Sequence, residues 1–447
     1  MKAPLDRLHA KLGDFWWYSL MLFCACRAAD CLNVFVGLWL VPKYVPPSEL
    51  GAVMPLLHFA NFLTIPVTVF ATTFRQELTS LAQRNELGKM KTLMRGVFTA
   101  TAAFFVLAIV VSRILLPHFL ERIRIAEGSL GLVILAATFI GAVNPVYVNA
   151  LQALKKFKAY SLINVLAAPV RLLVMLITMP FRALTGYFVG QGATPAFTIL
   201  ASIITLRTEL SVKAEPYWNL SIVKSLVRLF VIFGTLSTLS GFILLVESTI
   251  IRQRLPELDS AAYYMVTRFS DIASFLTATL AFTIFPISVG FATRGKDLRP
   301  IIFKAMGAIV ASNILLAGTF ALFGREILAI IPNGEKYQAY TWAIPSMVGI
   351  VTISSCTAIY TTVEIAASRF CFLKWWIPLN LAYPIALLCV SGHGYFTDLI
   401  PASCSTFLNK HCILSLESAL LWMGGFNIIR LIGALIAATR IKPVSSN

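Results

Sequence analysis

The sequence predicts an all-α integral membrane protein with about twelve transmembrane helices in two pseudo-repeated six-helix lobes. Of the 447 residues, 58% are hydrophobic and 13% are charged, whereas soluble domains carry roughly 25% charged residues. The apolar residues form long runs, and a helix needs roughly 20 such residues to cross a bilayer. The runs lack the alternation of barrel strands, so we expect every span to be helical.

An internal repeat predicts the two lobes. Residues 45–96 and 255–307 show the same order of features about 210 positions apart: a turn with a proline and an acid, a long apolar span, and a short basic hairpin. On this alignment Pro46 matches Pro256 and Thr73 matches Thr283. Such repeats are common in secondary transporters, which bind their substrate between the two halves.

The apolar runs define the order of the spans. The first run follows a basic N-terminal segment, is too long for a signal-peptide core and is not followed by a small-x-small cleavage motif, so we interpret it as a retained span. The twelve predicted spans are 15–41, 50–74, 93–117, 129–152, 159–181, 183–206, 225–251, 261–291, 301–323, 338–362, 370–391 and 415–438.

The positions of Lys and Arg predict the orientation. With the N-terminus in the cytoplasm, the cytoplasmic connections hold 23 of these residues and the opposite connections hold 10. The positive-inside rule then places both termini in the cytoplasm. The net charge of +17 is therefore a topology signal, and we expect no nucleic-acid partner. The polar stretch 208–222 is predicted to be a cytoplasmic linker between an N-terminal lobe (1–207) and a C-terminal lobe (223–447).

Motifs for catalysis and cofactors are missing from the sequence. There is no P-loop for ATP, no HExxH and no GxSxG, so we expect no enzyme and no cofactor. The eight cysteines show no zinc-ligand spacing, so we expect no metal. Cys404 and Cys412 lie in a loop predicted to be outside, where an oxidising compartment permits a disulfide; two free thiols are the alternative.

Ionisable residues within the predicted spans are the candidate functional groups, because charge at bilayer depth is costly and usually faces protein or a water-filled cavity. Span one carries Arg27 and Asp30, and span eight carries Arg268 and Asp271. A spacing of three residues places both members of a pair on one helix face. Each pair alone could be an internal salt bridge that joins helices. One pair in each lobe favours a shared polar cavity.

The side-chain chemistry indicates an anionic substrate. Arginine stays charged, and its planar fork binds two phosphate oxygens at once. The neighbouring acids could hold the guanidinium groups or take up a proton that drives the cycle. Five further groups are weaker candidates: Arg171 and Arg430 for the substrate, His58 as either a core hydrogen-bonding residue or a contact, and Glu247 and Glu364 as proton sites near span ends, where hydration is easier. Arg430 could also snorkel to the inner surface.

Two hairpins carry a family resemblance. The segment 144–173, NPVYVNALQALKKFKAYSLINVLAAPVRLL, and its counterpart 360–376, YTTVEIAASRFCFLKWW, resemble Wzx-type lipid-linked oligosaccharide flippases of the multidrug/oligosaccharidyl-lipid/polysaccharide exporter superfamily. That family often has an LQAL-basic-aromatic-Lys hairpin at this junction.

The resemblance implies a V-shaped pair of lobes around a central cationic cavity. It implies that an undecaprenyl-diphosphate-linked glycan, such as an O-antigen or exopolysaccharide precursor, moves from the cytoplasmic to the periplasmic leaflet of the bacterial inner membrane. A proton or Na⁺ gradient would drive the movement. In related lipid II flippases, arginines of spans one, two and eight line the cavity. Arg27 and Arg268 fit two of these places, and His58 stands at the third.

Two other functions remain open. A multidrug antiporter of the same superfamily would share the architecture, but its cavity should be acidic, whereas this sequence offers at least as many arginines as acids. A non-transporting membrane subunit could dock a glycosyltransferase, a polysaccharide polymerase or a synthase. The basic hairpins 75–95 and 294–304 could contact such a partner or anionic membrane lipids, or could serve topology alone.

Overall fold

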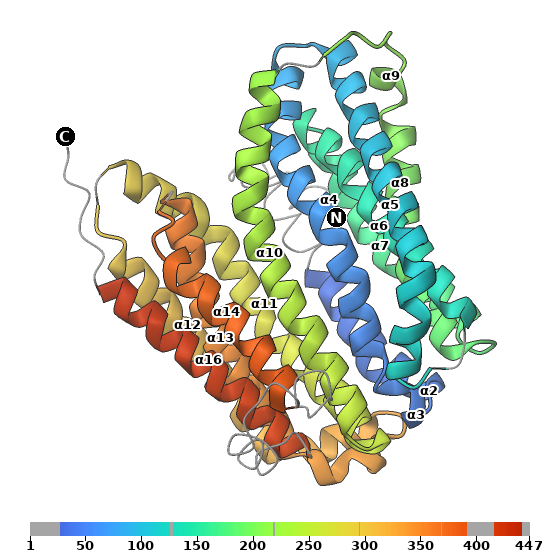
Figure 1. Ribbon diagram of the computed structural model, residues 1–447, viewed down its shortest axis with the longest axis vertical. Helices are drawn as coiled ribbons and strands as arrows, with labels where there is room; N and C mark the ends of the chain where they lie inside the picture. The colour runs from blue at the N-terminus through green and yellow to red at the C-terminus, as the bar shows by residue number, and fades with distance from the viewer. Residues whose placement is uncertain are drawn as a thin grey trace, which may run out of the picture. The chain divides into compact units, whose positions relative to one another are not determined.

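The chain is all α-helical in the computed structural model, which describes residues 27–125, 128–217, 220–294, 296–367, 369–390 and 415–439 (Figure 1). Residues 27–35 are helical, and no β-strand occurs among the described residues. The remaining elements are η1 (Val36–Leu40), α2 (Val41–Tyr44), α3 (Pro47–Leu50), α4 (Val53–Gln83), α5 (Leu87–Arg122), α6 (Gly128–Ala153), α7 (Phe157–Thr178), α8 (Ala183–Thr205), α9 (Arg207–Leu210), α10 (Leu220–Arg254), α11 (Glu257–Thr293), α12 (Arg299–Ile330), η2 (Gly334–Tyr340), α13 (Ala343–Ala366), α14 (Leu373–Val390) and α16 (Leu416–Thr439).

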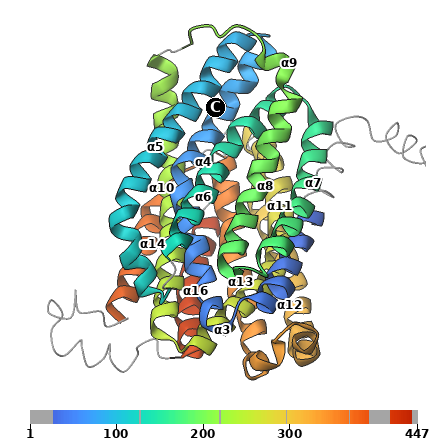
Figure 2. The same cartoon turned by 90° about the vertical axis from the view of Figure 1, so that its right-hand side faces the viewer.

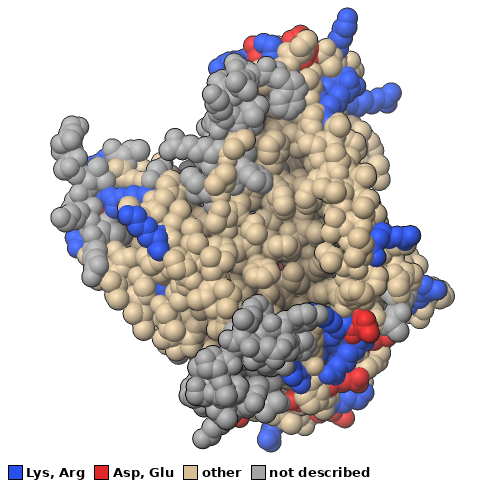
Figure 3. Space-filling view, in the orientation of Figure 1, with Lys and Arg blue, Asp and Glu red and all other residues tan. Residues whose placement is uncertain are grey.

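The helices have the length and composition of membrane spans. Nine helices in the described part of the chain are long and apolar enough to cross a bilayer. The helical residues before Leu40, together with α11 and α14, occupy the other predicted spans. On the face shown in Figure 3, Lys and Arg gather towards helix ends and leave a broad uncharged band. The prediction of an all-α membrane protein with about twelve transmembrane helices is confirmed.

Several helices extend beyond the spans that hydropathy predicts. α4 continues to Gln83 and α5 begins at Leu87, so most of the predicted connection 75–95 is helical. Asn85 takes a left-handed conformation in the intervening turn, with φ of 58°, which asparagine tolerates better than most residues. The end of an apolar run predicts where a helix leaves the lipid, and does not predict where the helix itself ends. The helix continues into water because its own backbone hydrogen bonds do not depend on lipid.

Helix packing divides the chain into two compact units. Unit 1 contains the described part of Met1–Val36 together with Leu56–Gly241, and unit 2 contains Gly37–Pro55 together with the described part of Phe242–Asn447. The first predicted span therefore begins in one unit and ends in the other. These units differ in their boundaries from the predicted lobes 1–207 and 223–447, which were based on the sequence repeat and stay a prediction.

Unit 1 is held by an apolar core at one end and by close helix contacts along α6, α7 and α8. One buried cluster joins α4, α5 and α6 and includes Phe74, Leu93 and Val146. α8 packs along both α6 and α7. Figure 2 shows α6 and α8 side by side.

The predicted linker is partly docked on unit 1. The Glu215 amide donates to the Gly88 carbonyl at 3.2 Å, the Thr92 hydroxyl donates to the Glu215 carbonyl at 2.6 Å, and the Lys91 ammonium donates to the Val212 carbonyl at 2.8 Å. Tyr217 donates to the Glu77 carboxylate. Burial, reinforced by this carboxylate, raises the pKa of Tyr217 to about 12, so the phenol keeps the proton that it donates.

Unit 2 packs α11, α12, α13 and α16 together and takes in residues 37–55. The buried Arg252 donates to the Ser48 carbonyl at 2.5 Å, and Asn333 donates to the Pro42 carbonyl at 2.8 Å. A Cβ at Gly51 would lie 2.1 Å from the Ser260 hydroxyl oxygen, so only glycine fits where α3 meets α11. These contacts explain why the end of the first span belongs to this unit.

Candidate functional site

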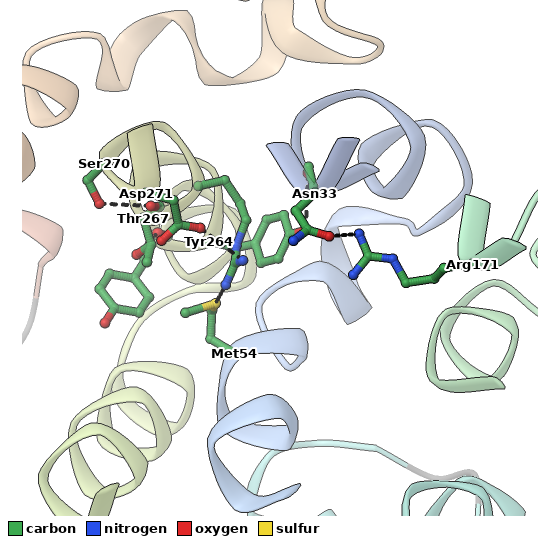
Figure 4. A network of polar contacts seen from close by, with 10 residues as sticks. Asn33, Met54, Arg171, Tyr264, Thr267, Ser270 and Asp271 are labelled. Carbon is green, nitrogen blue, oxygen red and sulfur yellow. Dashed lines mark hydrogen bonds and ion pairs between the residues drawn. The ribbon is translucent and has the colours of Figure 1, made fainter. Parts of the chain in front are cut away.

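Unit 1 holds two of the predicted arginines through separate partners. Arg27 and Asp30 form an ion pair, which was one of the two alternatives for them, with 2.9 Å between a guanidinium nitrogen and a carboxylate oxygen. Asn33 follows three residues later on the same helix face, and its side-chain oxygen accepts a hydrogen bond from Arg171 of α7 (Figure 4). We call Arg27, Asp30, Asn33 and Arg171 the unit 1 arginine cluster.

Unit 2 holds Arg268 on several sides. Its guanidinium lies 3.0 Å from the Asp271 carboxylate and 2.8 Å from the Met54 sulfur, and it sits 5.4 Å from the centroid of the Tyr264 ring (Figure 4). The Tyr264 hydroxyl donates to the Gly37 carbonyl at 3.1 Å. A Cβ at Gly37 would lie 2.8 Å from the Arg268 side chain. We call Arg268, Asp271, Met54 and Tyr264 the unit 2 arginine cluster.

The hydroxyls next to the Arg268–Asp271 ion pair donate to backbone carbonyls. Thr267 donates to the Tyr263 carbonyl at 2.7 Å, and Ser270 donates to the Thr267 carbonyl at 2.8 Å. Both hydroxyls are therefore engaged within their own helix. The Asp271 side chain is 40% exposed and that of Arg268 is 20% exposed, so the carboxylate is the partner with more room to move away.

Glu247 of α10 occupies a buried polar cluster in unit 2. It is 6% exposed, and its carboxylate accepts hydrogen bonds from Tyr263 at 3.3 Å and from Tyr383 at 3.1 Å. The expectation of easy hydration at this position is wrong, because helices α11 and α14 cover it. The sequence analysis did not single out either tyrosine, and no spacing links Tyr383 to a residue 136 positions earlier.

Arg430 of α16 borders the same cluster. Its guanidinium lies 5.4 Å from the Phe426 ring centroid and 5.8 Å from that of Trp376. The Phe426 ring stacks on Tyr383 at 3.8 Å, and Arg430 interacts electrostatically with Glu247. Aromatic faces attract a guanidinium by cation–π interaction. The two aromatic rings therefore position the Arg430 guanidinium. A side chain that only snorkelled to the membrane surface would not need these contacts. We call Glu247, Tyr263, Tyr383, Phe426 and Arg430 the Glu247 cluster.

The other predicted residues are not members of these three clusters. His58 is half-buried on α4. It stands where the resemblance implies a third arginine, and the structure does not test that role. Glu364 is 4% exposed, which again contradicts the expected hydration, and it lines a cavity beside α14. Cys404 and Cys412 lie outside the described residues. The described part of the chain contains no group of three His, Cys, Asp or Glu that could hold a metal.

The arrangement suits ion exchange. A phosphate can replace the carboxylate partner of an arginine, since both present oxygens to the same planar fork. A buried carboxylate with two phenol donors can take up a proton or a small cation as its hydrogen bonds rearrange. Both are steps of binding and release.

Comparisons by sequence find no relatives. No family model matches the chain, and no curated protein matches it.

Comparisons by structure find the fold in known transporters. An inward-facing multidrug resistance MATE family transporter of the MOP superfamily has a TM-score of 0.63 at 12% identity, over 94% of this chain and 96% of that one. An outward-facing transporter of the same description has a TM-score of 0.62 at 13% identity, over 96% and 95%. A MOP superfamily transporter from Pyrococcus furiosus Vc1, whose binding pocket is described as reversed in polarity and suggestive of a different function, has a TM-score of 0.61 at 12% identity, over 94% and 93%. The chain therefore has the MATE transporter fold.

Proposed function

We propose that this chain is a transporter of the MOP superfamily that flips an undecaprenyl-diphosphate-linked oligosaccharide for cell-surface polysaccharide assembly. The substrate moves from the cytoplasmic to the periplasmic leaflet of the bacterial inner membrane by gradient-driven alternating access. The shared fold supports transport. The observation that carries the substrate class is the set of arginines held at span depth: Arg27 and Arg171 in unit 1 and Arg268 in unit 2.

A diphosphate is the chemistry that these arginines recognise best. Each phosphate offers several oxygens, and a guanidinium binds two of them in parallel. Asn33, Met54 and Tyr264 are neutral partners that orient a guanidinium without adding an acid to the site. Asp30 and Asp271 balance their arginines until the diphosphate replaces them. The displaced carboxylates then take up protons, because an uncompensated charge at bilayer depth is costly.

The Glu247 cluster supplies the coupling step in this proposal. The Glu247 carboxylate binds the driving proton or cation, and the hydroxyls of Tyr263 and Tyr383 reorient as it does so. Binding changes the charge that Arg430 faces. A buried group of this kind can bias a packed unit between two arrangements. A polymerase or glycosyltransferase that supplies or consumes the glycan is the expected protein partner.

The test follows a fluorescent undecaprenyl-diphosphate oligosaccharide in proteoliposomes. We expect the native protein to move it between leaflets, and Arg27→Gln and Arg268→Gln each to slow the movement by at least about tenfold, the size expected for losing a charge-assisted hydrogen bond. Arg113→Gln is the matched control, because Arg113 is exposed on α5. Normal transport by both cluster variants, with correct insertion, would disprove the diphosphate contact.

A multidrug antiporter is the second candidate. It is favoured by the similar structures, which are described as multidrug transporters, and by the acidic Glu247 among the rings of Tyr263, Tyr383 and Phe426. Gradient-driven efflux of ethidium that Glu247→Gln abolishes, with no lipid movement, would establish this function instead. Failure of both assays would direct attention to a non-transporting subunit, sought by co-purification with a synthase.

A further inference from the structure

A cavity of about 1040 Å³ lies within unit 2 beside the turn that joins α13 to α14. α13, α14 and α16 form its walls. Its volume reaches the upper end of the 300–1,000 Å³ found for small-molecule pockets. None of its lining residues belongs to the arginine clusters or to the Glu247 cluster.

One end of the cavity carries two opposite charges. Glu364, in the last turn of α13, is 4% exposed, and its Oε1 atom is buried without a hydrogen-bond partner. Arg369 follows in the turn, where its amide donates to the Glu364 carbonyl at 2.9 Å, and the two side chains interact electrostatically. Arg369 also helps Arg299, the stronger influence, to lower the pKa of Asp297. The Arg369 guanidinium therefore interacts electrostatically with two acids, Glu364 and Asp297.

A third polar group at this end is an indole. Trp375 lies in the first turn of α14 and lines the cavity, and its Nε1 is buried without a hydrogen-bond partner. The ring packs against Gly433 of α16, where a Cβ would lie 2.8 Å from a ring carbon. A buried indole N–H usually finds an acceptor, and tryptophan is enriched at the depth of lipid headgroups. An acceptor is therefore expected from outside the chain.

The rest of the cavity is apolar. Ile429, Ile432 and Ile436 follow one another at spacings of three and four on one face of α16, and each exposes about half of its surface, at 55%, 51% and 48%. They line the cavity together with Leu379 of α14. This apolar wall has the chemistry of an acyl-chain surface.

We propose that the cavity binds one zwitterionic phospholipid with an ethanolamine headgroup. The phosphate lies against Arg369 and the Trp375 N–H, the ammonium lies against Glu364, and an acyl chain follows the isoleucines of α16. The two charges select this headgroup. An anionic lipid would meet Glu364 with no cation of its own, and an amphipathic cation would meet Arg369 with no anion. This inference is independent of the transported substrate.

The experiment is native mass spectrometry of the detergent-purified full chain with three lipids of identical acyl chains: phosphatidylethanolamine, phosphatidylglycerol and phosphatidylcholine. We expect one phosphatidylethanolamine to be retained about tenfold more tightly than either other lipid, because each lacks the hydrogen-bonding ammonium. Glu364→Gln and Arg369→Gln should each remove about that factor. Ala437→Phe, which fills part of the cavity without replacing a charged residue, should weaken retention of all three lipids.

The controls are Lys374→Gln and Glu417→Gln, exposed residues that do not line the cavity; both should retain phosphatidylethanolamine as the native chain does. Equal retention of the three lipids would show annular lipid only and overturn the proposal. Stronger retention of phosphatidylglycerol would also overturn it and indicate an anionic-lipid site. If Glu364→Gln does not fold, Arg369→Gln and Ala437→Phe still decide the matter.

Discussion

The fifth and sixth spans of the two repeats are packed in different ways. In unit 1, α7 lies along α8 over much of its length, whereas in unit 2 the equivalent α14 meets α16 at few positions. Helices in a bilayer gain little from burying apolar surface, so they associate through close packing of small residues or through polar contacts. The two pairs illustrate these two solutions.

Glycines bring the unit 1 pair together. A Cβ at Gly186 of α8 would lie 2.6 Å from the backbone of Met179, and one at Gly190 would lie 2.2 Å from the Met175 side chain. α16 offers Gly433 at its contact, but there the neighbour is the large ring of Trp375. The Trp375 ring occupies the space beside Gly433, and both residues line the cavity beside Glu364.

Polar and aromatic anchors hold α14 in place. Tyr383 donates to Glu247 of α10 and stacks on Phe426 of α16, and Trp376 lies under Arg430 of α16. A helix fixed at a few points can shift more readily than one packed along its length. Unit 2 therefore combines the buried acid with the helix that is anchored at fewer points, as the proposed coupling role of Glu247 requires.

Gly186→Ala tests the close-packed pair and has the largest expected effect. Alanine favours a helix over glycine by about 1 kcal/mol, but overpacking against a backbone typically costs 1–3 kcal/mol. Because the clash at Gly186 is with backbone at 2.6 Å, we take the upper end of this cost. We therefore expect a net loss of about 2 kcal/mol in the free energy of unfolding, measured in one detergent. Gly433→Ala should be near neutral, because the Trp375 ring can move into the cavity.

Gly141→Ala is the control for this series, because nothing lies within 4 Å of a Cβ at Gly141. It should be neutral or raise stability by up to about 1 kcal/mol. If Gly186→Ala were as stable as Gly141→Ala, close packing would not explain the difference between the two helix pairs.

Tyr383→Phe tests the anchored pair and has an intermediate effect. It keeps the ring that stacks on Phe426 and removes one donor from the Glu247 carboxylate. Leaving a buried acceptor partly unsatisfied costs about 1–3 kcal/mol, so we expect a loss of about 1–2 kcal/mol in the same unfolding assay. Tyr263→Phe should cost less, because its hydrogen bond is longer, at 3.3 Å against 3.1 Å. The reverse order would show that the α14 anchor is not the stronger contact.

Local sequence patterns predicted the features that depend on a single helix, namely span positions and residues that share a helix face. Apolar runs located the spans, and the spacing of three residues placed Arg27 with Asp30 and Arg268 with Asp271 on one helix face. Each pair forms the internal ion pair that was one of the two alternatives, and the shared polar cavity stays a prediction. Contacts between distant helices depend on how each helix is rotated about its axis. The approach of Tyr383 to Glu247 and of Asn33 to Arg171 is of this kind.

The sequence identified Glu247 and Glu364 as candidate residues but did not predict how deeply they are buried. Glu247 and Glu364 lie near predicted span ends, where water is expected, yet neighbouring helices cover both. The predicted linker shows the same effect outside the membrane. Residues 208–222 are polar, but carbonyls of Val212 and Glu215 find specific donors on α5. A polar composition does not reveal that a segment will dock.

The smallest expected effect concerns the turn where this linker begins. Lys156 pairs with Glu209 at 2.6 Å and donates to the Thr205 carbonyl at the end of α8 at 2.9 Å. Burial alone would raise the pKa of Glu209, but the hydrogen bond and charge of Lys156 outweigh it, and the pKa lies below its usual value. The pair therefore stabilises α9 above the ordinary carboxylate range and ceases to do so as the pH falls through the lowered pKa.

Glu209→Gln removes this pair without changing the shape of the side chain. Exposed ion pairs contribute 0.2–1 kcal/mol, so we expect the variant to speed amide hydrogen exchange at residues 207–212 by about twofold to fivefold at pH 7. Exchange in α14 of unit 2 should be unchanged. The difference between variant and native should shrink on acidification, because the native Glu209 then becomes neutral as well. A difference that persists at a pH well below 4 would show that the carboxylate charge does not hold the linker on unit 1.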